Sequence, residues 1–532
     1  MHGYAANEQA TPRLGRAGAC AFFVCAAIAW IALHVALVPY LVEDSYIHFR
    51  VAQNFAQSGH PYFNVGSAVK TSSSTPWTWL LGALFALAPQ GVALVVAVSA
   101  CISLAGAVVW VALLATIARR RLAAWEGALA ASVYLAIVQP ASVAAMETGL
   151  SLLFASLGMR QFARREPNAF LWLALAAMTR LELSVLCIAC AALALFTRAL
   201  PWKRCVFWAA CGLVPFALFD WWQYGTLVPQ AFVAKRILHR VPPVAAFSLL
   251  LPEAVSSEFY FRSAAYSAYA TVCVAVATLP LGRIAWSWRR LHEPAPQLLL
   301  ASSATGIAIA FTYVASRGLV FPWYRPLYFS FLFLSGLVGA ALSARRLPYV
   351  ALLASAAPFF YEIGTSAAAA LGRPESARHF LEGARAKHTL AVAAELYREY
   401  PGAVAMTSEI GAVGFGFRGR IEDGAGLASP RALSYYPLQV PSERYNSADA
   451  PVPLRFLEDV RPGLVIAVDR HLDSILAAPV RAEYVHIRKR LYDEDDDARR
   501  SSEMLLWDNI RALDVLIRKD LWEARKRVVR AP

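Results

Sequence analysis

Two adjacent carboxylates, Glu43 and Asp44, follow directly on a long apolar run and open a segment that also contains His48. Carboxylates serve as general bases in catalysis, and together with histidine they also bind metal ions. The sequence predicts a helix from residue 43 to about residue 57, whose first turn is a favourable place for negative charge. Successive helical residues point about 100° apart. One carboxylate can therefore cap the helix while the other faces a cavity.

The same residues also fit simpler interpretations. Acidic residues in a first turn stabilise a helix without any catalytic role, and residues four apart, such as Asp44 and His48, often form only a surface contact. A divalent cation beside Glu43, Asp44 and His48 is a further alternative. The local segment alone leaves these alternatives open.

A second group of charges interrupts apolar sequence. Arg180 and Glu182, in "AAMTRLELSV", separate two short apolar segments, and Glu147 lies in "AMETGL" between two others. Ionisable residues near membrane depth are costly and normally face a partner or a water-filled cavity. We expect a shallow hairpin with Arg180 and Glu182 at its apex, where a functional role and a structural ion pair are both open.

Cations with aromatic neighbours form a third group. Lys70 lies in "AVKTSSSTPW", Lys235 and Arg236 lie in "YGTLVPQAFVAKR", and Tyr324 and Arg325 lie in "FPWYRP". A single Lys or Arg of this kind can simply extend toward lipid headgroups. As a group, however, these cations are suited to binding a phosphate.

The composition indicates which elements must position these residues. The chain has 532 residues, of which 58% are hydrophobic and only 16% are charged, as expected for a polytopic membrane protein. The net charge of +14 comes from short Arg- and Lys-rich loops, which orient membrane proteins, so nucleic-acid binding is not indicated. All eight cysteines lie in apolar segments, which argues against a disulfide framework or a zinc site. No motif for a soluble nucleotide cofactor is present.

Eleven apolar segments are predicted to cross the membrane. They are residues 17–41, 92–117, 122–139, 148–162, 169–178, 183–196, 206–222, 263–284, 296–315, 327–343 and 347–361. Residues 77–88 are excluded because about a dozen helical residues reach only about 18 Å, against a hydrocarbon thickness of about 30 Å. The basic clusters then lie in the cytoplasm with the N-terminus, and the first loop and the C-terminal part lie outside.

Two domains are expected. Residues 1–371 form the transmembrane part, with a first extracytoplasmic loop over residues 42–91, and residues 372–532 form a small α/β domain outside the membrane. Within the second domain, "GAVAMTSEIGAVGF" and "PGLVIAVDR" are predicted to be strands. The segments "HTLAVAAELYREY" and "SSEMLLWDNIRALDVLIRKDLWEARKR" have the periodicity of helices.

Six motifs in this order resemble one family. They are "EDSYIHFRVAQNFAQSGHPYFNVGSAVKTSSSTPWTWLL", "AMETGL", "MTRLEL", "WWQYGTLVPQAFVAK", "PWYRP" and "TSEIGAVGFGFRGRIEDGAGL". Together they are similar to the membrane-embedded GT-C glycosyltransferases, and most similar to the branch that contains the terminal arabinofuranosyltransferases of mycobacterial cell walls. The resemblance covers most of the chain.

This resemblance implies a GT-C fold, a polyprenyl-phosphate sugar as donor, and a catalytic base in the first loop. Carried over by position, the base is Asp44, with Glu43 as the second candidate. The sequence departs from the family in having Glu-Asp where many relatives have Asp-Asp. It also lacks the proline that commonly follows the arginine at Arg180, which affects helix geometry.

The expected function is therefore an inverting glycosyltransferase in the bacterial cytoplasmic membrane. It would move arabinofuranose from a polyprenyl phosphate to a cell-envelope glycan or glycoprotein outside the cytoplasm. The candidate site residues are Asp44 and Glu43 for catalysis, Lys70, Lys235, Arg325 and Tyr324 for the donor phosphate, and Arg180, Glu182, Glu147 and His48 around the cavity. No cofactor is identified from the sequence, a divalent cation stays open, and the rival interpretation is a transporter or flippase of lipid-linked sugars.

Overall fold

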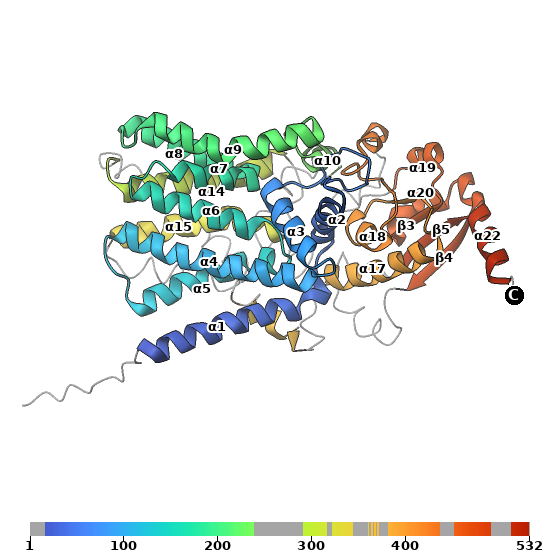
Figure 1. Cartoon of the computed structure of the whole chain (residues 1–532), viewed down its shortest axis with the longest axis horizontal. Coiled ribbons are helices and arrows are strands. Elements are labelled where there is room, and N and C mark those ends of the chain that lie inside the picture. Colours follow the sequence, from blue (N-terminus) through green and yellow to red (C-terminus); the bar gives the residue numbers. More distant parts are fainter. Residues whose placement is uncertain are drawn as a thin grey trace, which may run out of the picture.

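The computed structural model describes residues 16–238, 291–316, 322–343, 381–436, 452–490 and 512–530, with a few positions between 360 and 371. The predicted span over residues 263–284 and nearly all of the span over residues 347–361 lie outside the described residues. Figure 1 shows two parts, a long bundle of helices and a smaller sheet domain formed by the C-terminal part of the chain.

Apolar helices make up the bundle. They are α1 (Arg16–Ala36), α4 (Val92–Ala118), α5 (Ala124–Val143), α6 (Thr148–Ala163), α7 (Ala169–Thr179), α8 (Ser184–Thr197), α9 (Trp202–Tyr224), α14 (Pro294–Ser316) and α15 (Arg325–Ser343). Four of the described helices, α4, α5, α9 and α14, are long and apolar enough to cross a membrane. Others, such as α7 with 11 residues, are shorter apolar helices. The number of membrane spans, expected to be eleven, therefore stays a prediction.

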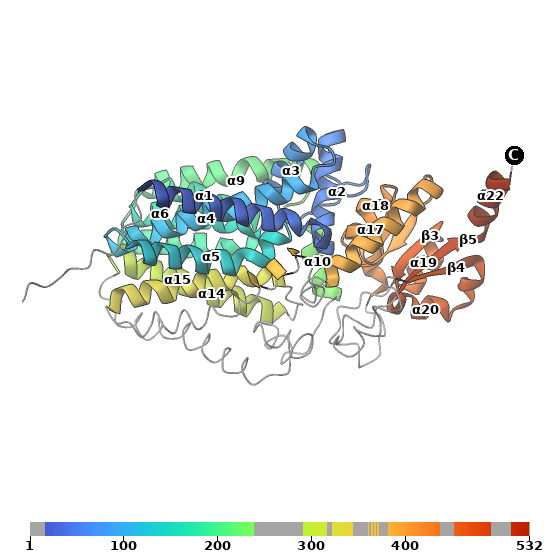
Figure 2. The same ribbon diagram turned by 90° about the horizontal axis from the view of Figure 1, so that it is seen from below.

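The first loop lies between the bundle and the sheet domain (Figures 1 and 2). It contains α2 (Glu43–Ser58), which confirms the helix predicted from residue 43, and α3 (Thr75–Leu87). Gly59 ends α2 in the left-handed conformation, with φ at 73°, which glycine adopts without steric cost. The two helices pack through apolar side chains, among them Phe49 and Phe85, whose ring centroids are 5.9 Å apart. The loop is thus an ordered platform.

The C-terminal domain has one sheet of five strands in the order β2-β1-β3-β5-β4. The strands are β1 (Ala405–Thr407), β2 (Ile421–Asp423), β3 (Leu464–Val468), β4 (Tyr484–Arg490) and β5 (Ala512–Arg518). β1 is parallel to β2 and β3, whereas β5 is antiparallel to β3 and β4. Helices α17 (Leu381–Glu399) and α18 (Ile410–Phe417) lie between the sheet and the first loop, and α22 (Lys519–Arg530) ends the described chain (Figure 1). The predicted α/β domain is confirmed, and its boundary near residue 372 stays a prediction.

Two local predictions in this domain are wrong. The segment "IGAVGF" belongs to helix α18 and not to a strand, and residues 512–518 form strand β5 and not a helix. Short apolar runs fit either structure, so tertiary contacts decide between them. β5 is buried and pairs on both edges, with Leu464 opposite Ile517 and Tyr484 opposite Arg518.

Candidate active site

A cavity of about 180 Å³ lies where the bundle, the first loop and the C-terminal domain meet. Its charged and hydroxyl-bearing lining includes Asp44, His48, Ser73, Arg180, Glu182, Lys235, Arg236, Tyr313 and Tyr324. These residues come from α2, the loop after it, the connection between α7 and α8, α10 (Gln230–Leu238), α14 and the 3₁₀ turn before α15. Leu427, from the C-terminal domain, completes one side. Segments far apart in the sequence therefore form one mixed polar and apolar site.

Asp44 and Lys235 face each other across this cavity. Lys235 Nζ lies 3.4 Å from Asp44 Oδ2 and donates a hydrogen bond of 2.6 Å to Tyr324 Oη. Burial by itself would lower the pKa of Lys235, but Asp44 and Tyr324 outweigh it and raise that pKa above its ordinary value. Lys235 is therefore a permanent cation next to a carboxylate.

Arg180 supplies a second cation. Helix α7 ends at Thr179, and the extended backbone at Arg180 turns the chain at the predicted apex. The guanidinium donates to Glu147 Oε1 at 2.7 Å and to Glu182 Oε1 at 2.8 Å, and it lies 4.7 Å from the centroid of the Tyr324 ring. The Arg180–Glu182 pair therefore exists, and both members also line the cavity.

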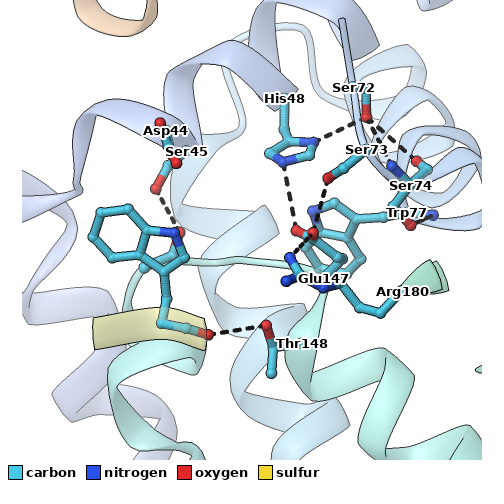
Figure 3. A network of polar contacts seen from close by, with 12 residues as sticks. Asp44, Ser45, His48, Ser72, Ser73, Ser74, Trp77, Glu147, Thr148 and Arg180 are labelled. Carbon is cyan, nitrogen blue, oxygen red and sulfur yellow. Dashed lines mark hydrogen bonds and ion pairs between the residues drawn. The ribbon is translucent and has the colours of Figure 1, made fainter. Parts of the chain in front are cut away.

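Glu147 organises the residues behind the cavity wall (Figure 3). It is fully buried, accepts hydrogen bonds from Arg180 and from Ser73 Oγ at 2.9 Å, and lies 3.4 Å from His48 Nε2. Burial alone would raise the pKa of Glu147, but Arg180 and His48 together lower it to about 2. Glu147 is thus an ionised anchor for two cavity residues.

His48 is buried, and burial lowers the pKa of its imidazole despite the nearby carboxylates. Its Nδ1 lies 3.0 Å from Ser72 Oγ. In Figure 3 the Asp44 carboxylate lies apart from His48 and Glu147. Residues Asp44 and His48 therefore share the cavity without forming the direct contact that their spacing allowed.

Glu43 directly precedes Asp44 in α2, but its side chain contacts the C-terminal domain. Its Oε1 accepts a hydrogen bond of 2.9 Å from Ala412 N in α18, and the residue is not part of the cavity lining. Among the described residues, no group of three or more His, Cys, Asp and Glu side chains is placed to hold a metal ion. The two adjacent acids therefore have different surroundings, as the helix geometry predicted.

Lys70 lies apart from the other predicted cations. Its ammonium forms a buried ion pair of 2.5 Å with Asp220 Oδ2 and donates to Leu227 O at 3.0 Å. Asp220 also accepts a 2.6 Å hydrogen bond from Thr75 Oγ1, so this cluster joins the first loop to α9. Asp220 is not among the residues predicted from the sequence, although an acid inside an apolar helix signals a partner.

Arg325, at the start of α15, directly follows the cavity residue Tyr324. Its side chain is only 8% exposed, and its Nε and Nη2 atoms find no hydrogen-bond partner among the residues that the structure describes. A buried guanidinium with only part of its hydrogen bonds formed is costly. Arg325 is not among the residues that line the cavity, so its assignment to the donor phosphate stays a prediction.

The fold and this site define a polytopic helical membrane protein with a first-loop platform and a terminal sheet domain. Two solved structures of ArnT from Cupriavidus metallidurans share this architecture. The structure bound to undecaprenyl phosphate has a TM-score of 0.54 at 14% identity and covers 95% of this chain and 99% of its own. The apo structure has a TM-score of 0.51 at 15% identity, with 94% and 99% covered. No protein-family model and no curated protein sequence matches the chain.

Proposed function

We propose that this protein is an inverting GT-C glycosyltransferase that uses a polyprenyl-phosphate sugar. The observation that carries the proposal is the cavity in which the Asp44 carboxylate faces Lys235, with Arg180 beside them. A base and cations are what the transfer of a sugar from a lipid phosphate requires. One of the similar ArnT structures is bound to undecaprenyl phosphate, which supports this class of donor.

In the proposed step, Asp44 accepts the proton of the acceptor hydroxyl as the oxygen attacks the anomeric carbon. The new carbon–oxygen bond forms on the face opposite the phosphate, and the old bond breaks with its electron pair leaving on the polyprenyl phosphate. The anomeric configuration is therefore inverted, through a transition state with oxocarbenium character. General-base assistance of this kind typically contributes a factor of 10² to 10⁴.

The cations stabilise the departing phosphate. Lys235 Nζ lies 3.4 Å from Asp44 Oδ2, longer than the roughly 2.8 Å of a tight charged hydrogen bond, and it also donates to Tyr324 Oη at 2.6 Å, so a donor phosphate in the cavity would share the ammonium with these two groups. Arg325 supplies a buried guanidinium with two nitrogen atoms unpartnered among the described residues, and Tyr324 orients Lys235. Lys70 is not assigned to the phosphate, because its ammonium is already bonded to Asp220.

Within this proposal the sugar is arabinofuranose, the acceptor is an extracytoplasmic glycan or glycoprotein of the cell envelope, and the protein lies in the bacterial cytoplasmic membrane with its N-terminus inside. The resemblance of the six motifs, taken together, to the branch that contains the terminal arabinofuranosyltransferases supports the choice of sugar. Glu43, Glu147, Glu182 and His48 position other groups and do not themselves take the proton.

The test is an incubation of the detergent-purified protein with radiolabelled polyprenyl-phosphate arabinofuranose and cell-envelope glycans. The proposal expects labelled glycan and released polyprenyl phosphate in equal amounts, with no membrane barrier present. A flippase would give no covalent product in detergent, but would move the labelled lipid across the bilayer of proteoliposomes. That pair of results would overturn the proposal, and a product only with another sugar would overturn the choice of arabinofuranose.

A further inference from the structure

Glu43 is a carboxylate of the catalytic helix that the proposed transfer step does not use. Its side chain binds the first turn of α18 through the 2.9 Å hydrogen bond from Ala412 N. Amide groups in the first turn of a helix have no partner within the helix, and a negative charge there is favourable. The next residue, Asp44, faces the cavity. One turn of α2 therefore carries the proposed base and a contact to the C-terminal domain.

The two helices approach each other closely at this point. A Cβ atom added to Gly411 would collide with the backbone carbonyl of Glu43. Apolar contacts continue beside it, since the ring of Phe415 lies 5.5 Å from that of Tyr46 and 6.0 Å from that of Phe49. The contact between α2 and α18 therefore depends on a glycine and leaves no room for a larger side chain.

Further along α2, Arg50 also joins this helix to the C-terminal domain. Its guanidinium donates to Phe63 O at 2.7 Å, to Gly419 O at 2.6 Å and to Gly414 O. Asn64 adds two bonds to the backbone of Ile421, accepting from its N at 3.0 Å and donating to its O at 2.8 Å. The C-terminal domain is thus bonded to the catalytic helix and to the loop that follows it.

This contact also fixes the wall that the C-terminal domain adds to the cavity. β2 follows α18 and ends at Asp423, whose carboxylate accepts from Ala425 N at 2.8 Å and from Ala428 N at 2.6 Å. Between these two amides lies Leu427, which lines the cavity, and Gly426 O accepts from Gln230 Nε2 in α10 at 3.0 Å. The turn that carries Leu427 is therefore connected to α18 along the chain through β2, and to α10 through Gln230.

We infer that Glu43 is a positioning residue that docks α18 on the catalytic helix and thereby sets the acceptor side of the cavity. The inference rests on the proposed function, in which the cations that hold the donor phosphate all belong to the bundle and to α10. Among the described lining residues, the C-terminal domain contributes Leu427 and no charge. Its wall is therefore assigned to the other substrate, the acceptor.

Three variants test this role. Glu43→Ala removes the hydrogen bond, Gly411→Ala pushes α18 from α2 without changing any carboxylate, and Glu43→Gln keeps an oxygen that accepts from Ala412 N. Hydrogen exchange of the α18 amides is expected to rise at least tenfold in the first two variants and to stay within threefold in the third. Glu483→Ala, which removes an ion pair with Arg461 elsewhere in the C-terminal domain, serves as the matched control.

Transfer kinetics distinguish a positioning role of Glu43 from a catalytic role. The KM for the acceptor is expected to rise at least fivefold in Glu43→Ala and Gly411→Ala, with kcat changed less than threefold, while Glu43→Gln resembles the unaltered protein. Equal loss of kcat in Glu43→Gln and Glu43→Ala would make Glu43 a catalytic group and overturn the inference. Unchanged hydrogen exchange in Glu43→Ala would overturn it even if the protein catalysed no transfer, so the two proposals fail separately.

Discussion

Replacing Glu147 by glutamine removes the charge at the centre of the buried network while nearly preserving its shape. The pKa of this carboxyl falls from 4.5 to about 2 in the folded protein, chiefly because Arg180 and His48 outweigh the effect of burial. Each tenfold change in proton affinity corresponds to about 1.4 kcal/mol. The fold therefore favours the ionised carboxylate by about 3 kcal/mol, and we expect Glu147→Gln to lower the free energy of unfolding by up to that amount at pH 7.

The pH dependence gives the sign of this effect. A carboxyl whose pKa is depressed by folding stabilises the protein fully above pH 4.5, and that stabilisation is lost as the pH falls toward 2. The difference between the original protein and Glu147→Gln is therefore expected to be largest at pH 7 and to fall to about half at pH 3. Unfolding in detergent, followed by tryptophan fluorescence, measures it.

Asp220→Asn is the matched control, because it disrupts another buried ion pair that lies outside the cavity. Both variants are expected to be less stable at pH 7. Only Glu147→Gln is expected to lower kcat/KM for the donor, by about tenfold, because it also releases Arg180 from a 2.7 Å contact. Equal stability of Glu147→Gln and the original protein at pH 7, or a difference that grows as the pH falls, would refute this reasoning.

Other substitutions separate the roles of the cations. Lys235→Gln is expected to lower donor kcat/KM by about 10²-fold, since one charged contact to a developing anion is worth roughly 3 kcal/mol; a loss below threefold would exclude Lys235 from the phosphate site. Tyr324→Phe removes the 2.6 Å bond to Lys235 and is expected to lower donor kcat/KM about tenfold in the same assay. Lys70→Met is expected to lower the unfolding midpoint and leave the donor KM unchanged, whereas a raised KM would return Lys70 to the phosphate site. Arg325→Gln is expected to weaken binding of polyprenyl phosphate in a titration while leaving the folded protein at least as stable, because it removes a buried charge that is only partly satisfied by the described residues.

Much of the cavity could be predicted from the sequence, because ionisable residues that interrupt apolar segments carry a large cost of desolvation. Arg180, Glu182 and Glu147 interrupt apolar segments, and such groups gather around partners or water. The structure brings these three residues together with Asp44 and Lys235. The two acids of α2 separate as the 100° step per helical residue requires.

The partners of single residues could not be predicted from spacing. Lys70 and Asp220 are 150 positions apart, and no local pattern connects a lysine of the first loop with an acid near the end of α9. Ala412 binds Glu43 from 369 positions away, through a backbone amide that any residue type except proline provides. Tyr313 and Leu427 line the cavity without any distinctive sequence signal.

In the C-terminal domain, the sequence pattern predicts the wrong secondary structure for two segments. Residues 512–518 follow a helical pattern when they are read together with their neighbours, but they form β5 because both of its edges find partners. In "EIGAVGF" the glycines suggested a strand bounded by turns, whereas Gly411 allows α18 to lie against α2. In both segments a contact with a distant part of the chain decides the local structure.

The central claim is that Asp44 takes the proton of the acceptor hydroxyl. The most direct measurement compares the rate of sugar transfer from radiolabelled polyprenyl-phosphate arabinofuranose in Asp44→Asn and in the original protein, with Glu43→Gln measured beside them. We predict that the turnover rate of Asp44→Asn falls by a factor of about 10² to 10⁴, and that Glu43→Gln changes it less than threefold. An Asp44→Asn protein that transfers the sugar at the original rate would contradict the assignment of Asp44 as the base.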